Sequence, residues 1–596
     1  MIAGISARDK ARSSRVRTVV RSPEGARSYA PTAVEGISPI RVLKHVLADQ
    51  VGAVGNVFRN PMLRRLELAW GGFFVVEWAS LLAVSIWAYG DGGASAVGLV
   101  GLLRMLPAAV ALPFGSAVAD RFPRHRVLVV VYLAQAVLVA GVAADIQADG
   151  PPALTYLLIA LVGVVAAPCR PAQLALAPML ARSPEELVAA NVTQMTFEGV
   201  ATLLGPVLAG AVLAVSGPPA ALGVAAGFSL AGALLVAGVR AAADPTLAAR
   251  RDREPVLDSL TGGLRELARL PGLGAIIGGF WAQTFVRGML NVLVISLTLR
   301  TLGLGQGAVG FLSGTFGAGV ILGALAATSM VGMRRLGRPV AVALVLWGLP
   351  LVVIALRPSV VVVVAALIVS GVGNAVLDVA GFTLMQRVAD DRVLGRVFGV
   401  FYVGVLASMG VGSIVAPALI GLIGIRGALT LGGVLLPAAA LVIYPRLKQI
   451  DDYASVPEPP LSVVAAVPLF EPLPPTSLEK LARAAVKEIV SAGSTVVAQG
   501  ERGDTFYLVV DGSLEVEVDG SLVRILGAGD VFGEVALLRD VPRTATVSAT
   551  TPTTLLTIRR MDFLAAVLGS PASAEAVEQL VSSRIGASTE QIPIVS

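Results

Sequence analysis

The feature that most constrains the fold of this chain is a series of apolar stretches between Leu66 and Tyr444. A helix that crosses a lipid bilayer needs about 20 predominantly apolar residues. The chain has 596 residues and a mean hydropathy of +0.80, with 55% hydrophobic and 14% charged residues, which is typical of a polytopic membrane protein. Twelve stretches are long enough to span, near residues 66–90, 94–119, 127–146, 153–177, 187–215, 219–239, 272–298, 306–332, 339–356, 359–385, 396–423 and 428–445.

The reactive side chains of the chain exclude several classes of protein. The single cysteine, Cys169, excludes an internal disulfide and a cysteine-rich metal site, and only two histidines, His45 and His125, are available for zinc. We therefore expect no metal and no resident cofactor, and without a catalytic triad we expect no enzyme. The net charge of +6 comes from basic residues beside apolar runs, which indicates membrane topology and not nucleic-acid binding.

Arginine residues set the expected orientation of the bundle. The loops after the even-numbered spans hold 16 arginines, within residues 120–126, 182–186, 240–270, 333–339 and 386–396. The loops on the opposite side hold only Arg300, Arg357 and Arg426. Because positive residues stay on the cytoplasmic side, we expect both chain termini in the cytoplasm and the bundle in the cell membrane.

The apolar region also divides into two similar halves. An arginine-rich turn follows the second span and another follows the eighth, and the longest connector, residues 240–270, lies between the sixth and seventh spans. Two six-helix halves joined by a polar loop are the layout of a rocking transporter. Ahead of the first span we expect a cytoplasmic tail over residues 1–62, in which residues 39–60 are either an interfacial amphipathic helix or a simple lead-in to the span.

The stretch GSAVADRFPRHRVL, residues 115–128, resembles the loop signature of the major facilitator superfamily of transporters. Asp120, Arg121 and Arg124 fit that signature, whereas Ser116 and Pro123 stand where the family usually has glycine. Asp120 can cap backbone amides at a helix junction and pair with a neighbouring arginine, which would latch the two halves in one state. The alternative is a charged turn that only sets the topology.

Other segments resemble the multidrug and siderophore-exporter branch of the same superfamily, and the resemblance covers about residues 60–446. In the fifth span, GPVLAG resembles the Gly-Pro motif of exporters, in which Gly205, Pro206 and Gly210 would kink the helix and let another helix pack closely. The alternative is ordinary transmembrane glycine and proline. We assign the transporter domain to residues 63–446.

Charges inside the predicted spans are the strongest pointers to a transport site, because each costs about 2.5–3.5 kcal/mol in hydrocarbon. Glu77 and Arg104 both come near the midplane, at about 1.5 Å of rise per residue, and could pair across adjacent helices. We expect Glu77 or Glu198 to take up and release protons; a static ion pair is the alternative. The full set of buried charges is Glu77, Arg104, Glu198, Arg287 and Asp378, with Gln135, Gln283, Asn291 and Asn374 as expected substrate contacts.

The composition changes after Tyr444. Residues 447–463 are rich in proline and acidic residues and suit a linker. From there the pattern is one of short alternating strands broken by glycine turns, with helices at each end, which predicts a β jelly-roll domain over residues 464–586. Residues 587–596 are left as a C-terminal tail.

The stretch FGEVALLRDVPRTATV, residues 532–547, lies between two of these strands. Gly533 permits a tight bend, EVALL can form one helical turn whose free amides point at an anion, and Arg543 supplies a fork of donors that matches a phosphate. This pattern resembles the phosphate-binding cassette of cyclic nucleotide-binding domains, as do the flanking residues 500–516 and 526–534.

The resemblance implies a role for each cassette residue. Glu534 would accept a hydrogen bond from the ribose 2′-hydroxyl, and Arg543 would bind the cyclic phosphate, assisted by the backbone amides of Ala536 and Leu537. Thr544 would contact phosphate or base, and a helix near residues 573–585 would close as a lid. The ligand is cAMP or cGMP, with cAMP favoured. The alternative is a domain of the same fold that has lost ligand binding.

We therefore expect an all-α membrane bundle of twelve transmembrane helices in two six-helix halves, followed by a β jelly-roll domain. The expected function is a secondary transporter, an antiporter for proton-driven efflux of a small molecule, regulated by a cyclic nucleotide. A second hypothesis is a membrane-anchored receptor whose bundle is only a scaffold, and a third is a transporter whose tail domain only tethers. A nucleotide-gated channel is weaker, since the chain has no filter-like loop and no arginine-rich sensor helix.

Overall fold

The computed structural model describes residues 57–239, 256–327, 335–389, 391–454, 458–467 and 475–567, together with seven single residues before or between these ranges. Most of the expected tail 1–62, with the amphipathic helix over 39–60, lies outside the described residues. So do the expected lid helix near 573–585 and the tail 587–596.

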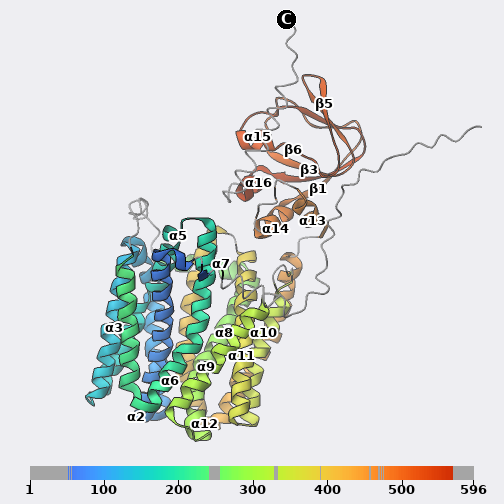
Figure 1. Ribbon diagram of the computed structural model, residues 1–596. Coiled ribbons are helices and arrows are strands. Elements are labelled where there is room, and N and C mark those ends of the chain that lie inside the picture. Colours follow the sequence, from blue (N-terminus) through green and yellow to red (C-terminus); the bar gives the residue numbers. More distant parts are fainter. Residues whose placement is uncertain are drawn as a thin grey trace, which may run out of the picture. The chain divides into compact units, whose positions relative to one another are not determined.

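The apolar region is a bundle of long helices, as Figure 1 shows. Within the described ranges, nine helices are long and apolar enough to cross a membrane, with α4 and α5 together forming one of them and η3 continuing α8. The elements are α2 (Pro61–Arg121), α3 (Arg124–Gln147), α4 (Pro152–Ala166), α5 (Cys169–Leu180), α6 (Pro184–Ala237), α8 (Pro271–Ser296), η3 (Leu297–Thr301), α9 (Gln306–Ala327), α10 (Gly337–Leu356), α11 (Val360–Val388) and α12 (Asp391–Ala454).

Three of these helices are each broken once by a glycine. Gly93 in α2, Gly217 in α6 and Gly424 in α12 have φ angles of 63°, 77° and 72°. A residue with a Cβ atom adopts this left-handed region only at a cost, so glycine allows the chain to reverse there. Each of the three helices therefore supplies two spans, and the twelve-span bundle predicted from the sequence is confirmed.

Helix starts follow the capping residues in the sequence. The side chain of Asn60 accepts hydrogen bonds from the backbone N–H groups of Met62 and Leu63 at the start of α2. Ser183 caps α6 in the same way, and Pro61 and Pro184 occupy the first helical positions, where a missing N–H costs nothing.

The two halves of the bundle are α2–α6 and α8–α12, and the connector between them carries helix α7 (Val256–Arg269). The halves approach backbone to backbone at the end that carries Gly93, Gly217 and Gly424, which we call the kinked end. A Cβ atom added at Gly210 would lie 2.7 Å from the carbonyl oxygen of Gly307 and 2.8 Å from Cα of Gly310, so α6 and α9 touch there. A Cβ atom at Gly98 would lie 2.6 Å from the carbonyl oxygen of Ser413, so α2 and α12 do the same.

The last helix of the bundle continues past the predicted end of its span, as far as Ala454. Near its end, Oδ1 of Asp451 accepts hydrogen bonds from the backbone N–H groups of Leu336 (2.9 Å) and Gly337 (3.0 Å). These amides are at the start of α10, where the first turn of a helix leaves N–H groups without intrahelical partners. A short helix, α13 (Glu458–Ala465), follows α12 in the chain.

The C-terminal domain contains two antiparallel four-stranded sheets (Figure 1). Their strand orders are β1-β8-β3-β6 and β2-β7-β4-β5, which confirms the jelly-roll prediction. Apolar residues of both sheets fill the space between them, among them Val509 and Leu555 of the first sheet and Leu514 and Val547 of the second. The elements are α14 (Pro475–Ala484), β1 (Val486–Val490), β2 (Thr495–Val497), β3 (Thr505–Asp511), β4 (Leu514–Val518), β5 (Ser521–Leu526), β6 (Val531–Phe532), α15 (Glu534–Arg539), β7 (Thr546–Ala549), β8 (Thr553–Arg559) and α16 (Arg560–Val567).

Candidate functional site

The cassette segment of the C-terminal domain forms a strand, a bend and a short helix. Strand β6 ends at Phe532, and Gly533 follows with a φ of 88°, in the left-handed region that favours glycine. Helix α15 begins directly at Glu534, so its first backbone amides lie beside the bend. The tight bend and the single helical turn predicted from the sequence are both present.

Arg543 lies inside the domain, with only 7% of its surface exposed. Its Nη1 atom donates to the carbonyl oxygen of Gly533 (3.1 Å) and its Nη2 atom to that of Thr505 (2.7 Å). The backbone N–H of Arg543 also donates to the carbonyl oxygen of Glu501 (2.7 Å), which fixes the loop that carries it. The guanidinium is thus held against the bend and strand β3 by carbonyl oxygens, which are acceptors that an anionic oxygen can replace.

The other cassette residues differ in how far they are exposed to solvent. Glu534, Ala536 and Leu537 are each about 1% exposed. A Cβ atom added at Gly503 would lie 2.6 Å from Cζ of Arg543, so glycine is required there for the guanidinium to keep its place. Thr544, which we expect to contact phosphate or base, has an exposed side chain.

An aromatic pair completes this part of the domain. The rings of Tyr507 on β3 and Phe532 on β6 stack at 4.7 Å with 4° between their planes, and Cζ of Arg543 lies 5.6 Å from the Tyr507 ring. Burial raises the pKa of Tyr507 above its ordinary value, against the opposing effect of the Arg543 charge. The phenol therefore stays neutral at physiological pH and offers the arginine an uncharged ring face.

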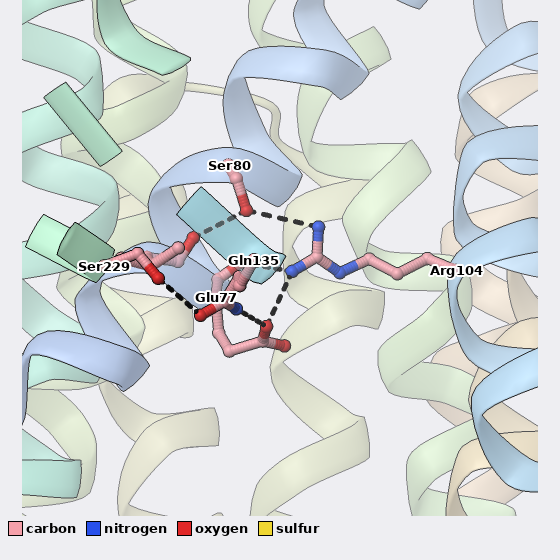
Figure 2. Close-up of polar contacts among 6 residues, drawn as sticks. Glu77, Ser80, Arg104, Gln135 and Ser229 are labelled. Atoms are coloured by element: carbon pink, nitrogen blue, oxygen red, sulfur yellow. Dashed lines mark hydrogen bonds and ion pairs between the residues drawn. The ribbon is translucent and has the colours of Figure 1, made fainter. Parts of the chain in front are cut away.

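In the bundle, the ion pair expected between Glu77 and Arg104 is present. Figure 2 shows the carboxylate of Glu77 between Arg104 and Gln135, with Oε1 accepting from Nη2 of Arg104 (3.0 Å) and from Nε2 of Gln135 (3.0 Å). Nη1 of Arg104 donates to Oγ of Ser80 (3.2 Å), and Oγ of Ser229 donates to Oε1 of Gln135 (2.9 Å). The network joins both spans of α2 to α3 and α6.

Glu198 has a partner that the sequence did not suggest. Its Oε1 atom pairs with Nη2 of Arg170, at the start of α5. The Arg170 guanidinium also lies over the rings of Trp70, Phe74 and Tyr402, with Cζ 5.5–5.7 Å from the three centroids. Tyr402 is on α12, so this cluster joins the two halves of the bundle.

Arg287 and Asp378 are both in the second half, and an amide connects them. Nη1 of Arg287 donates to Oδ1 of Asn374 (3.1 Å), and Nδ2 of Asn374 donates to Oδ2 of Asp378 (2.7 Å). The buried Gln283 donates to the same Oδ1 atom (3.2 Å). Of the five intramembrane charges, the structure thus brings Glu77 together with Arg104 and brings Arg287 near Asp378, but pairs Glu198 with a residue outside the set.

Residues of the expected latch and of the glycine-proline motif occupy different surroundings. Arg121 is exposed, whereas Arg124 is buried and donates from Nη1 to the sulfur of Met179 on α5 (2.8 Å); the side chain of Asp120 lies outside what the structure describes. In α6, a Cβ atom at Gly205 would lie 2.9 Å from Cβ of Trp78, so this glycine packs against α2. Pro206 lies within the same helix, and Gly210 is in the contact with α9 described above.

Glu67, in α2, is a buried acid that reasoning from the sequence missed. Its side chain is 0% exposed, and within the described residues neither carboxylate oxygen has a hydrogen-bond partner. Two other buried side chains also have polar atoms without a hydrogen-bond partner in the described part of the chain: Gln173 on α5, at both its Oε1 and Nε2 atoms, and Trp70, at Nε1. The signal in the sequence was weak, because Glu67 stands one residue inside the predicted start of the first span, where an exposed interfacial acid is common.

Comparison with known families identifies both parts of the chain. Residues 68–296 and 276–498 match the Major Facilitator Superfamily, and residues 487–569 match the Cyclic nucleotide-binding domain family. The chain belongs to the major facilitator superfamily of membrane transporters. It carries, in addition, a C-terminal cyclic nucleotide-binding domain, which supports a cyclic nucleotide as its regulatory ligand.

Curated relatives match about a fifth of the chain or less. A cyclic nucleotide-gated potassium channel of Rhizobium etli is 40% identical over 124 residues, which are 21% of this chain and 35% of the channel. A cAMP-dependent protein kinase regulatory subunit of Yarrowia lipolytica is 43% identical over 99 residues, 16% of this chain and 26% of that protein. The match thus spans about a third or less of the length of these relatives.

Solved structures also match over about a fifth of the chain. A structure of Sp-2Cl-cAMPS bound to PKAR CBD2 is 26% identical and has a TM-score of 0.20, covering 22% of this chain and 86% of that one. The catabolite activator protein of Thermus thermophilus is 28% identical with a TM-score of 0.19, covering 21% of this chain and 61% of that one.

Proposed function

We propose that the protein is a proton-coupled exporter of a small molecule in the cell membrane, and that cAMP binding to its C-terminal domain regulates transport. The buried, inward-held guanidinium of Arg543 carries the regulatory part of this proposal. A surface arginine without a ligand role would extend into water, whereas this one is fixed beside the first amides of α15.

The choice of cAMP is supported by a relative, because the regulatory subunit from Yarrowia lipolytica is by name cAMP-dependent. Thr544, which follows the arginine, is compatible with either cyclic nucleotide. On the proposed mechanism, the cyclic phosphate replaces the carbonyl oxygens of Thr505 and Gly533 as acceptor from Arg543. The ribose 2′-hydroxyl donates to the carboxylate of Glu534.

Proton coupling is supported by the acids inside the bundle. Glu77 and Glu198 each pair with an arginine, and protonation of either acid would release that arginine. Protonation of Glu198 would also affect the contact between the two halves, because its partner Arg170 lies over the ring of Tyr402 in the second half. Glu67 is a third candidate, since an ionised carboxylate without a partner is costly at a buried position. Cytoplasmic termini, as the arginine distribution predicts, would place the nucleotide domain where cAMP is made.

Proteoliposomes that contain a pH-sensitive dye test this function. A panel of small organic molecules is applied to reconstituted full-length protein, and an exported substrate is expected to produce a proton flux that changes several-fold when cAMP is added. A substrate flux that is independent of the pH gradient would refute proton coupling. If the protein binds cAMP but its substrate flux does not change, the result would favour the tether hypothesis. If no compound in the panel is transported, the result would favour the receptor hypothesis.

A further inference from the structure

A cavity lies between the two halves of the bundle, and its lining has an unusual charge distribution. Its empty volume is about 680 Å³, counting space open to solvent, and α2 and α6 line it from one half and α8, α9 and α11 from the other. Of the fourteen lining residues, nine are apolar, four are uncharged polar residues and one, Arg287, is charged. We propose that the transported substrate is an amphipathic organic anion that binds with its negative group on Arg287 and its apolar body against these walls; this rests on the transport function proposed above.

The guanidinium of Arg287 is held in a fixed orientation. The rings of Trp78, from the first half, and Phe316, from the second, each lie 4.9 Å from its Cζ atom. Nη1 donates to Oδ1 of Asn374, which fixes one edge of the group. Within the described residues, its Nε and Nη2 atoms have no acceptor, and Arg287 lines the cavity, so these donors are available to a ligand.

The charge of Arg287 distinguishes it from the two other arginines deep in the bundle. Arg104 and Arg170 each have a carboxylate within ion-pair distance, Glu77 and Glu198 respectively. Among the described side chains, no carboxylate lies that close to Arg287, and Asp378 reaches it only through the amide of Asn374. A cation in an apolar cavity without a direct counter-ion favours an anionic ligand and repels a cationic one.

The apolar walls determine the rest of the ligand. Leu81, Leu82, Leu290 and Val294 line the cavity together with the two aromatic rings, and Asn291 and Ser313 add hydrogen-bonding groups. Apolar lining with a few convergent polar groups is the pattern of a site that buries most of a small organic molecule. A small inorganic anion would leave these walls unused, which is why we infer an amphipathic molecule.

Two isosteric ions of opposite charge, tetraphenylborate and tetraphenylphosphonium, provide the test. Their binding to full-length protein in lipid nanodiscs is measured by calorimetry for the wild type, Arg287→Gln, Arg287→Lys and the control Arg300→Gln. Arg300 is matched because it also lies over an aromatic ring, that of Tyr89, but does not line the cavity. The probes also partition into the lipid of the nanodiscs. This contribution is the same for every variant, so it drops out when the affinities of the variants are compared.

We expect the wild type and Arg300→Gln to bind the borate more tightly than the phosphonium. Arg287→Gln should lose at least about 30-fold in borate affinity, and Arg287→Lys should keep the preference for the anion, which excludes misfolding as the cause. Tighter binding of the phosphonium, equal borate affinity in Arg287→Gln, or binding of neither ion by the wild type would overturn the anion site. An anion site in a protein that moves no substrate in proteoliposomes would instead refute the transport function alone.

Discussion

The guanidinium of Arg543 donates from Nη2 to the carbonyl oxygen of Thr505 across 2.7 Å, which ties the cassette to strand β3. A neutral carbonyl is a weaker acceptor than a phosphate oxygen. On the proposed function, a phosphate oxygen would replace this acceptor without any large movement of the backbone, so the cassette would be pre-organised for its anionic ligand.

Arg543→Ala should weaken cAMP binding by about 30-fold to several-thousand-fold, because losing one member of a desolvated charge pair costs about 2–5 kcal/mol. The measurement is calorimetric titration of the full-length protein. Arg559→Ala is the control, because the side chain of Arg559 is 85% exposed. Equal affinities for the wild type and Arg543→Ala would mean that the phosphate binds elsewhere.

Gly503→Ala should also reduce cAMP affinity, although it removes no polar group. The new Cβ atom would lie 2.6 Å from Cζ and Nε of Arg543 and would displace the guanidinium. Gly527→Ala is the matched control, since nothing lies within 4 Å of its Cβ position. The same titration measures the cAMP affinity of both variants. If Gly503→Ala and Gly527→Ala have equal affinities, the position of the guanidinium does not matter for binding.

Much of this architecture could be predicted from the sequence, because it depends on local patterns. Apolar length and arginine placement predicted the spans, and the order of glycine, acid and arginine in the cassette predicted the bend at Gly533. The depth of Glu77 and Arg104 in adjacent spans also predicted their ion pair. Each of these features depends on spacing along one segment or two neighbouring segments.

Contacts between helices distant in sequence could not be predicted in this way. Gln135 shares the carboxylate of Glu77 from α3, Arg170 pairs with Glu198 from α5, and Asn374 lies between Arg287 and Asp378. These partners depend on how the helices rotate and cross, which the pattern of a single apolar span leaves open. The burial of Glu67 was missed for a different reason, because an acid at the start of a span is usually an exposed interfacial residue.

Glu77→Ala should lower the melting temperature of the protein more than the double change Glu77→Ala with Arg104→Ala. Breaking the pair leaves the guanidinium of Arg104, whose side chain is 3% exposed, buried without its counter-ion, at a cost of about 3–5 kcal/mol. Thermal denaturation in detergent, followed by tryptophan fluorescence, compares four proteins: the wild type, Glu77→Ala, Arg104→Ala and the double variant. A double variant that melts as low as the sum of both single effects would show that the two charges do not interact.

Gly210→Ala should destabilise the bundle by about 1–3 kcal/mol, because its Cβ atom would press on the backbone of α9 at Gly307 and Gly310. Gly223→Ala, in the second span of α6, has nothing within 4 Å of its Cβ position and should be neutral or stabilising by up to about 1 kcal/mol. Melting temperatures of the two variants provide the comparison. Equal shifts would argue against close packing of the halves at the kinked end.

The central claim, that a nucleotide bound at Arg543 changes the state of the transporter, can be tested without a known substrate. A cysteine placed at Ser313, in the wall of the cavity, is labelled with a water-soluble thiol reagent, since the native Cys169 is buried and contributes little background. We predict that saturating cAMP changes the labelling rate by about 5-fold or more, as expected for an ordinary allosteric coupling, and that Arg543→Ala removes the effect. An unchanged rate in protein that calorimetry shows to be saturated with cAMP would contradict the account.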